Sequence, residues 1–277
     1  MKKSKEKRKI NYFILIFRII SIIIIAVCLY VLYLWDQDNR ANDSLQKDLS
    51  SIYADSTPID SSNNSANNTT PFASKYTLVI DENGLNIELF NIDFESLKNQ
   101  NPDSVAWVRV LDTNISYPIL QTDNNDYYLT HNIEGKKNGA GWIFADYRNN
   151  FENLDKNTII YGHNRRNGTM FSNLKFYLDK DFCADENHKY INFNTQKQRY
   201  LAEVFSVYKT ASNKVELPNE FESAEDFLKT IEMWKSASIY DFQTEVTSVD
   251  NVLSLYTCDN NTAYRILIHA KLLPLDV

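Results

Sequence analysis

The sequence predicts a mostly β domain with a few short helices, preceded by a separate apolar helix near the N-terminus. Eight short runs rich in Val, Ile, Tyr and Phe lie between residues 105 and 272, and such residues prefer strands. Gly and Pro number only six each among 277 residues, which excludes collagen-like and linker-rich classes. Hydrophobic residues make up 43% of the chain, enough to form a core. A closed barrel is the architecture that this pattern favours.

The N-terminus has the pattern of a membrane anchor. Residues 1–9 are rich in Lys and Arg, and the apolar run that follows, Ile10 to Leu34, is interrupted only by Asn11, Arg18 and Ser21. As a helix this run spans about 37 Å, enough to cross a hydrocarbon core of about 30 Å. A cleaved signal peptide or a lipoprotein at Cys28 are the alternatives, but the run is long and no small-residue cleavage site follows it. We therefore expect a cytoplasmic tail over 1–9 and a transmembrane anchor over 10–35, with the rest outside the cell.

A polar segment separates this anchor from the folded domain. Residues 36–75 are rich in Ser, Asn and Thr and offer little to bury, so a flexible extracellular stalk is expected there. Apolar periodicity then runs from 76 to 277, the predicted folded domain. The chain has a formal net charge of -7, and its Lys and Arg cluster only in the first ten residues. Nucleic-acid binding is therefore not expected.

The elements of the domain follow in order from the local patterns. Helical spacing predicts short helices over 94–101 and 170–178, and a third over 224–234 inside an insert of residues 210–250. The eight predicted strands are Val105–Leu111, Ile115–Leu120, Trp142–Ala145, Thr158–Tyr161, Tyr190–Phe193, Tyr200–Lys209, Val252–Cys258 and Tyr264–Leu272. The helix-bearing insert thus lies between the sixth and seventh strands.

Cys258 is the candidate nucleophile. It ends an apolar strand and precedes a polar turn, and strand ends are rigid platforms that open onto loops. Its reactive form is the thiolate, which needs a neighbouring base or cation. The alternatives are a small buried residue, or a disulfide with Cys183 in an oxidising compartment.

Two further residues could assist a thiolate. Among the four histidines, His163 also follows a strand, and Gly162 before it permits a close approach of another group. His269 shares one strand face with Arg265 and Leu267 and fits a barrel wall better, while His131 and His188 have the pattern of ordinary loop residues. A hairpin of the last two strands would return Arg265 to Cys258, where a cation stabilises an oxyanion or holds a substrate carbonyl. A surface Arg on an edge strand is the alternative.

Several segments in order resemble the sortase family, class B in particular. The histidine segment, Tyr161-Gly162-His163-Asn164, and the cysteine strand, Leu255-Tyr256-Thr257-Cys258 followed by Arg265, resemble the family's catalytic motifs. Tyr256 departs from the pattern, since class B usually has Ser there. The remaining segments are Asn101-Pro102-Asp103 with Trp107, Asn125-Asp126-Tyr127-Tyr128-Leu129, and Gly141-Trp142-Ile143-Phe144 with Asp146.

The resemblance implies an eight-stranded sortase-type barrel with Cys258 as nucleophile, His163 as acid/base partner and Arg265 as stabilising cation. It also implies substrate-binding residues along a groove, and no metal or other cofactor. These groove residues would be Asn125, Leu129, Tyr161, Tyr256, Thr257 and Asp259.

The implied reaction is acyl transfer. Cys258 would attack a sorting motif near the C-terminus of a secreted protein, and a peptidoglycan amine or its precursor would release the thioacyl enzyme. Two alternatives stay open: a cysteine peptidase or hydrolase in which water replaces the amine, and a non-catalytic surface module with a Cys183–Cys258 disulfide. A pilin-polymerising variant is less favoured, because no clear lid segment precedes the barrel.

Overall fold

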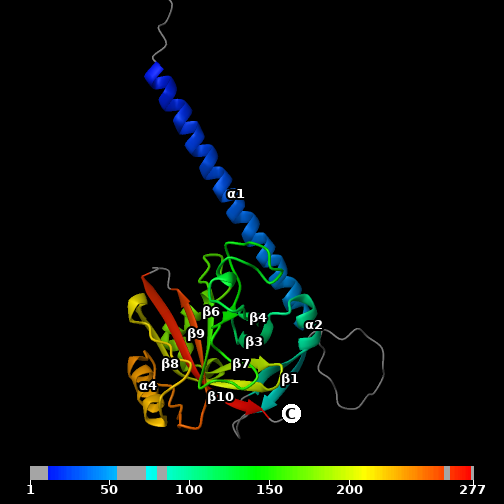
Figure 1. Ribbon diagram of the computed structural model, residues 1–277, viewed down its shortest axis with the longest axis vertical. Helices are drawn as coiled ribbons and strands as arrows, with labels where there is room; N and C mark the ends of the chain where they lie inside the picture. Colours follow the sequence, from blue (N-terminus) through cyan, green and yellow to red (C-terminus); the bar gives the residue numbers. More distant parts are fainter. Residues whose placement is uncertain (1–11, 55–72, 80–85, 259–262, 276–277) are drawn as a thin grey trace, which may run out of the picture. The chain divides into compact units, whose positions relative to one another are not determined.

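The computed structural model describes residues 12–54, 73–79, 86–258 and 263–275 (Figure 1). The described chain forms two compact units that divide between Ala41 and Asn42. In the first unit, the described residues are the N-terminal part of one long helix, α1 (Tyr12–Ala54). The second unit contains the barrel.

Helix α1 contains a stretch, Tyr12–Leu45, that is long and apolar enough to cross a membrane. Its large apolar side chains between Tyr12 and Trp35 are exposed, from 79% at Phe13 to 44% at Leu34. The helix continues to Ala54, so residues 36–54 are helical and not the flexible segment expected there. Asp, Asn, Gln and Ser are frequent along this part, and polar residues can continue a helix that has already begun. Residues 55–72 of the expected stalk lie outside the described residues.

The second unit is an eight-stranded closed barrel, which confirms the predicted fold class. Its strands follow the order β10-β8-β7-β3-β4-β5-β6-β9, with parallel pairing in β4–β5 and β6–β9 and antiparallel pairing elsewhere. The barrel strands are β3 (Ser104–Val110), β4 (Ser116–Leu120), β5 (Phe144–Ala145), β6 (Asn157–Gly162), β7 (Tyr190–Thr195), β8 (Arg199–Ala211), β9 (Val252–Cys258) and β10 (Tyr264–Leu275).

The shorter elements differ from expectation in two places. A hairpin of β1 (Ala73–Val79) and β2 (Asn86–Ile92) precedes the barrel and was not predicted. The helix expected from Met170 begins only at Ser172, as the 3₁₀ helix η2 (Ser172–Leu178), because Met170 has a positive φ of 56°. The remaining elements are α2 (Phe94–Gln100), α3 (Lys180–Ala184), α4 (Ala224–Ala237), and the 3₁₀ turns η1 (Tyr127–Leu129), η3 (Glu186–Lys189) and η4 (Ser212–Lys214).

The two-residue period of the strands divides their side chains between the barrel interior and its outer face. On β9, Leu253 and Leu255 enter the main core together with Ile160 of β6. Ser254 and Tyr256 therefore point outward, and Cys258 follows Tyr256 by two residues along the strand. The strand that ends in the candidate nucleophile is thus fixed in register by the residues that it buries.

Helix α4, from the predicted insert, covers part of this outer face. Its side chains at i, i+4 and i+7 (Phe227, Ile231 and Trp234) are buried and pack with Phe205 of β8 and Val252 of β9. Ser223 caps the helix by accepting a hydrogen bond from the amide of Asp226, 3.1 Å away. Figure 1 shows α4 beside β8. The half of the face nearest the start of β9 is therefore closed.

His269 is buried beneath α4, as a barrel-wall residue. Its ring stacks on Trp234 with centroids 3.9 Å apart. The Ser254 hydroxyl donates to Asn157 Oδ1 at 2.7 Å, so it must accept the proton of His269 Nδ1, 2.8 Å away. Burial lowers the pKa of His269 from 6.5 to about 3, so the imidazole is neutral in the folded protein.

This burial predicts a loss of stability in acid. The unfolded chain binds a proton at His269 near pH 6.5 and the folded chain only near pH 3, so stability falls as pH drops through this window. At pH 4.5 the loss attributable to His269 is about 2–3 kcal/mol. Urea unfolding at pH 7 and pH 4.5 should show that His269→Gln, which cannot titrate, reduces the acid loss by this amount. Equal acid losses in both proteins would contradict the prediction.

Candidate active site

The ends of β6, β9 and β10 bring the three predicted catalytic residues to one place. Cys258, the last residue of β9, pairs directly with Arg265 of β10. Gly162, the last residue of β6, pairs with Thr257 in the parallel β6–β9 ladder, so His163 is level with Cys258. Directly paired residues project to the same face of a sheet. The register thus places all three positions at one end of the same outer face.

His163 has a defined hydrogen-bond partner. Its Nε2 lies 2.9 Å from the carbonyl oxygen of Leu129, which can only accept, so Nε2 carries the proton. Nδ1 is then the nitrogen left for proton exchange in the neutral ring. Burial lowers the pKa of His163 more than the bond to Leu129 raises it, so the neutral form predominates at pH 7.

The Leu129 carbonyl is itself held in place by the segment around Asp103. Tyr128 donates its hydroxyl proton to Asp103 Oδ2 at 2.6 Å, and Asn101 Nδ2 donates to the same hydroxyl oxygen at 3.1 Å. Gly141 packs against both this segment and His163, with a positive φ of 60°. A Cβ at this position would collide with the Tyr128 and Leu129 carbonyls and come within 3.0 Å of His163 Cδ2. Only glycine allows this close approach.

Gly162 also permits the close approach that its sequence position suggested. A Cβ on it would collide with Ile143 and with the ring of Phe171. The amide of Phe171 donates to the carbonyl of His163 at 3.0 Å, which closes the loop after β6. His163 is therefore held from both its backbone and its side chain.

Arg265 is bonded to its neighbours on the same face. Its Nε donates to the hydroxyl of Tyr256 at 2.7 Å, and its Nη1 donates to the carbonyl of Tyr264 at 3.0 Å. Tyr256 also meets the ring of Tyr161 edge-on, with centroids 5.2 Å apart. The two tyrosines form a half-buried floor beside the ends of the strands.

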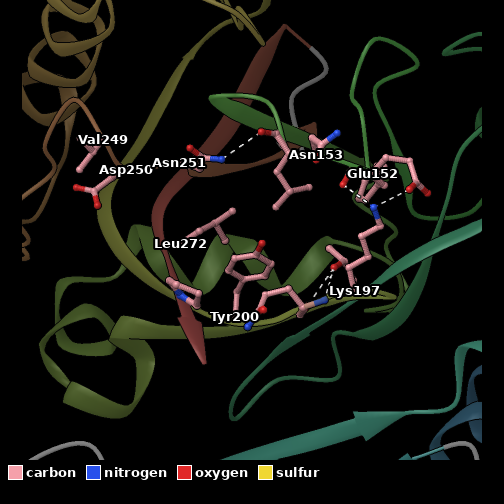
Figure 2. Close-up of a pocket in the computed structure, with 13 residues that line it drawn as sticks. Glu152, Asn153, Lys197, Tyr200, Val249, Asp250, Asn251 and Leu272 are labelled. Carbon is pink, nitrogen blue, oxygen red and sulfur yellow. Dashed lines mark hydrogen bonds and ion pairs between the residues drawn. The ribbon is translucent and has the colours of Figure 1, made fainter. Parts of the chain in front are cut away.

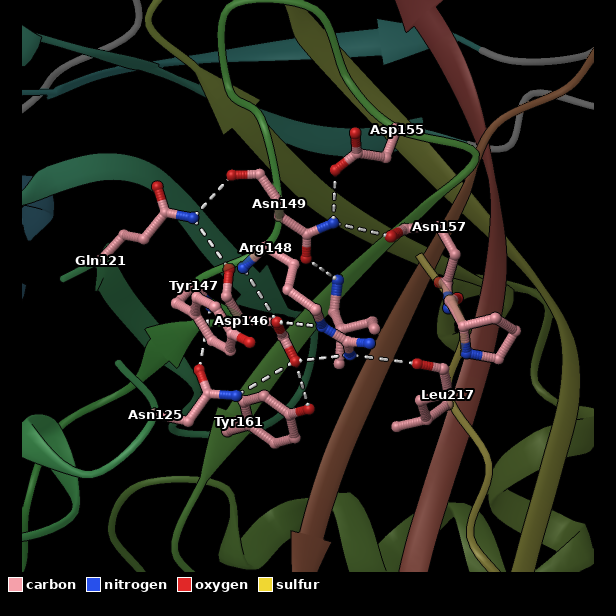
Figure 3. Close-up of polar contacts among 12 residues, drawn as sticks. Gln121, Asn125, Asp146, Tyr147, Arg148, Asn149, Asp155, Asn157, Tyr161 and Leu217 are labelled. Atoms are coloured by element: carbon pink, nitrogen blue, oxygen red, sulfur yellow. Dashed lines mark hydrogen bonds and ion pairs between the residues drawn. The ribbon is translucent and has the colours of Figure 1, made fainter. Parts of the chain in front are cut away.

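A buried carboxylate, Asp146, anchors this floor (Figure 3). Its side chain is only 1% exposed and pairs with Arg148 through Nε at 2.8 Å and Nη2 at 2.9 Å. Tyr161 donates its hydroxyl proton to Asp146 at 2.8 Å, and Asn125 Nδ2 donates at 3.2 Å. Burial would raise the pKa of Asp146, but these bonds, chiefly from Arg148, lower it to about 2. Asp146 thus stays ionised and holds the Asn125 loop against β6.

Replacing Asp146 by Asn should destabilise the barrel by roughly 2–3 kcal/mol, because the half-exposed Arg148 loses its charge partner and Tyr161 loses an ionised acceptor. Chemical denaturation at pH 7 measures this loss. Asp155→Asn is a suitable control, since its carboxylate accepts from the neutral groups Asn149 Nδ2 and the Asn150 amide. A loss no larger for Asp146→Asn than for the control would contradict the assigned role.

The expected groove residues do not all reach this face. Asn125, Leu129, Tyr161 and Tyr256 lie around it, but Thr257 points into the barrel and is 1% exposed, because strand residues alternate. Thr257 is therefore corrected from a groove residue to a core residue. Asp259 lies outside the described residues.

The other cysteine and histidines lie in separate surroundings. Cys183 is a free, buried thiol that donates to the carbonyl of Tyr177 at 3.1 Å, which removes the expected alternative of a Cys183–Cys258 disulfide. His188 bonds Phe182 and Asp112, and His131 stacks on Tyr127. In the described part of the chain, no group of three or more His, Cys, Asp or Glu could hold a metal ion.

Sequence reasoning missed Arg148 and did not assign Asp146 a role. Asp146 directly follows the short strand β5, and Arg148 comes two residues later. An acid and a base at this spacing can form an ion pair across a turn, and this was the available signal in the sequence. The backbone carbonyl of Leu129 carries no signal in the sequence at all.

A cavity of about 520 Å³ lies at the other end of the barrel (Figure 2). Its lining includes Leu154, which precedes β6, and Asn251, which precedes β9, whereas His163 and Cys258 stand at the far ends of the same strands. Lys197 and Glu152 form an ion pair at its rim, 2.7 Å apart. This cavity is separate from the catalytic end.

Comparisons with known proteins point to a single family. A family model described as the sortase domain matches residues 108–273. Sortase B of Listeria monocytogenes is 42% identical over 183 residues, which cover 65% of this chain and 74% of that protein.

Two solved structures are similar over the barrel. A Staphylococcus aureus sortase B–substrate complex is 35% identical with a TM-score of 0.63, covering 66% of this chain and 86% of that one. Sortase B from Bacillus anthracis in complex with AAEK1 is 30% identical with a TM-score of 0.68, covering 86% and 99%.

Proposed function

The chain belongs to the sortase family, as a class B cysteine transpeptidase that anchors surface proteins to the cell wall, and from this premise we propose that Cys258, His163 and Arg265 carry the reaction. The observation that supports the proposal is the register of β6, β9 and β10, which aligns the three positions at one end of one face. Each residue has the chemistry that its role requires: a thiol, an imidazole and a permanent cation.

In the first half of the reaction, the Cys258 thiol passes its proton to Nδ1 of His163, and the resulting thiolate attacks the backbone carbonyl carbon of a sorting motif. The carbonyl electrons move onto the oxygen, and the guanidinium of Arg265 stabilises this oxyanion. The C–N bond then breaks, and His163 gives a proton to the departing amine. The product is a thioacyl enzyme.

In the second half, an amine of the cell wall attacks the thioester carbonyl. His163 accepts its proton, the C–S bond breaks, and Cys258 leaves as the thiolate. Nδ1 of His163 is the nitrogen proposed to carry the proton in both halves, since Nε2–H is bound to Leu129. The same imidazole acts as acid and then as base.

The anchor and the groove complete the proposal. Residues 1–9 lie in the cytoplasm, residues 10–35 within α1 cross the membrane once, and the catalytic domain lies outside, where secreted substrates and peptidoglycan precursors are available. Asn125, Leu129, Tyr161 and Tyr256 line the substrate groove. Asp259 is proposed for the same groove on the resemblance alone.

Product analysis of the full chain in detergent micelles tests the activity. The protein is incubated with peptides of the N-P-x-T-x and x-P-x-T-G kinds, with and without triglycine, and products are followed by mass spectrometry. We expect cleavage at one bond of one motif, with the acyl fragment joined to triglycine when it is present. A scrambled peptide of equal composition should remain intact. Hydrolysis that triglycine leaves unchanged would instead favour a cysteine peptidase.

A further inference from the structure

The guanidinium of Arg265 is fixed at two neighbouring nitrogens. Nε donates to the Tyr256 hydroxyl at 2.7 Å, and Nη1 donates to the Tyr264 carbonyl at 3.0 Å. Because the guanidinium is planar and rigid, two bonds from adjacent nitrogens determine both its position and its plane. One partner is backbone, available whatever residue stands at 264. The other is a side chain that this sequence supplies.

Tyr256 reaches Arg265 along a diagonal of the β9–β10 ladder. Cys258 is directly opposite Arg265, so Tyr256, two residues earlier, is its diagonal neighbour on the same face. Diagonal neighbours are about 7–8 Å apart, a gap that aromatic and long side chains bridge. A short side chain at 256 would leave Nε without this acceptor.

Tyr256 is itself supported from the other side. Its ring meets Tyr161 nearly at right angles (78°), and Tyr161 donates to the buried carboxylate of Asp146 at 2.8 Å. Arg148 in turn fixes Asp146 with two hydrogen bonds. The Tyr256 hydroxyl is therefore presented to Arg265 from a floor connected to the barrel.

We propose that Tyr256 is a positioning residue, whose hydroxyl holds the Arg265 guanidinium in the orientation that stabilises the oxyanion beside Cys258. The inference rests on the proposed function, in which Arg265 carries that role. It adds to the groove position of Tyr256 a role for its hydroxyl, whose loss lowers the rate of the chemical step rather than substrate affinity.

Tyr256→Phe tests the proposal, since it removes the hydroxyl and keeps the ring against Tyr161. We expect kcat to fall about tenfold, the loss of one hydrogen bond to a charged group, with KM changed less than about twofold. Tyr200→Phe, which removes a hydroxyl at the other end of the barrel, should leave both constants unchanged. Thermal unfolding of each variant monitors the fold.

A double-mutant cycle with Arg265→Lys makes the test independent of general structural effects. Lysine keeps the charge but has no planar guanidinium for the hydroxyl to orient, so Tyr256→Phe should cause a much smaller loss of kcat in that background. Equal losses in both backgrounds, a change in KM alone, or a wild-type kcat for Tyr256→Phe would overturn the proposal. If Arg265→Lys and Arg265→Ala both retain wild-type kcat, it is the assigned role of Arg265 that fails.

Discussion

Replacing Cys258 by Ala is expected to abolish both peptide cleavage and amine transfer, lowering kcat by at least about 10³-fold. The methyl group of alanine cannot form the thioacyl intermediate, and no water is activated in its place. The loss should be equal for cleavage and for transfer, because both pass through the same intermediate. Rates measured with the motif peptide and triglycine, at enzyme concentrations high enough to detect a residual reaction, give the ratio.

Cys183→Ala is the matched control for this substitution. It makes the same chemical change at a buried thiol in α3, which donates to the Tyr177 carbonyl. It should cost some stability, about 1 kcal/mol, and leave kcat unchanged. If Cys183→Ala were the inactive variant and Cys258→Ala the active one, the nucleophile assignment would be wrong.

His163→Gln should lower kcat/KM by about 10²–10⁴-fold, the usual contribution of a positioned general acid and base. Glutamine can still donate to the Leu129 carbonyl, so the loop remains tied, but it cannot transfer a proton. We expect the wild type to show a bell-shaped pH dependence of kcat/KM and the variant to lose the limb that belongs to the imidazole. Initial rates across pH 5–9 measure both effects.

His188→Gln separates this effect from the loss of any histidine. His188 bonds the Phe182 carbonyl and pairs with Asp112 at 3.0 Å, in an element that contributes nothing to the catalytic face. Its replacement should leave the pH profile intact. An unchanged profile for His163→Gln would mean that another group exchanges the proton.

The sequence was most informative where the local pattern and the position in a strand agree. Cys258 and His163 could be selected because each follows an apolar strand, and the barrel was predictable from eight short runs. The order of the strands was not, since parallel pairing of β6 with β9 joins segments that are far apart in the chain. This single pairing places His163 level with Cys258.

Other features depend on contacts that leave no sequence pattern. Leu129 acts on His163 through a backbone oxygen, and Gly141 matters because three groups converge on it. Thr257 was expected in the groove because it adjoins Cys258, yet alternation along the strand turns it into the core. The polar part of α1, which continues to Ala54, lacks the apolar residues whose spacing would predict a helix there.

The central claim is that Cys258 carries the acyl group, and mass spectrometry of the enzyme during turnover tests it most directly. The full chain is mixed with the cleaved motif peptide without amine, quenched in acid within the first turnovers, and digested. We predict an adduct with the mass of the N-terminal fragment of the peptide, located on Cys258 and removed when triglycine is added before the quench. Steady turnover with no adduct, or an adduct on another residue, would contradict the account.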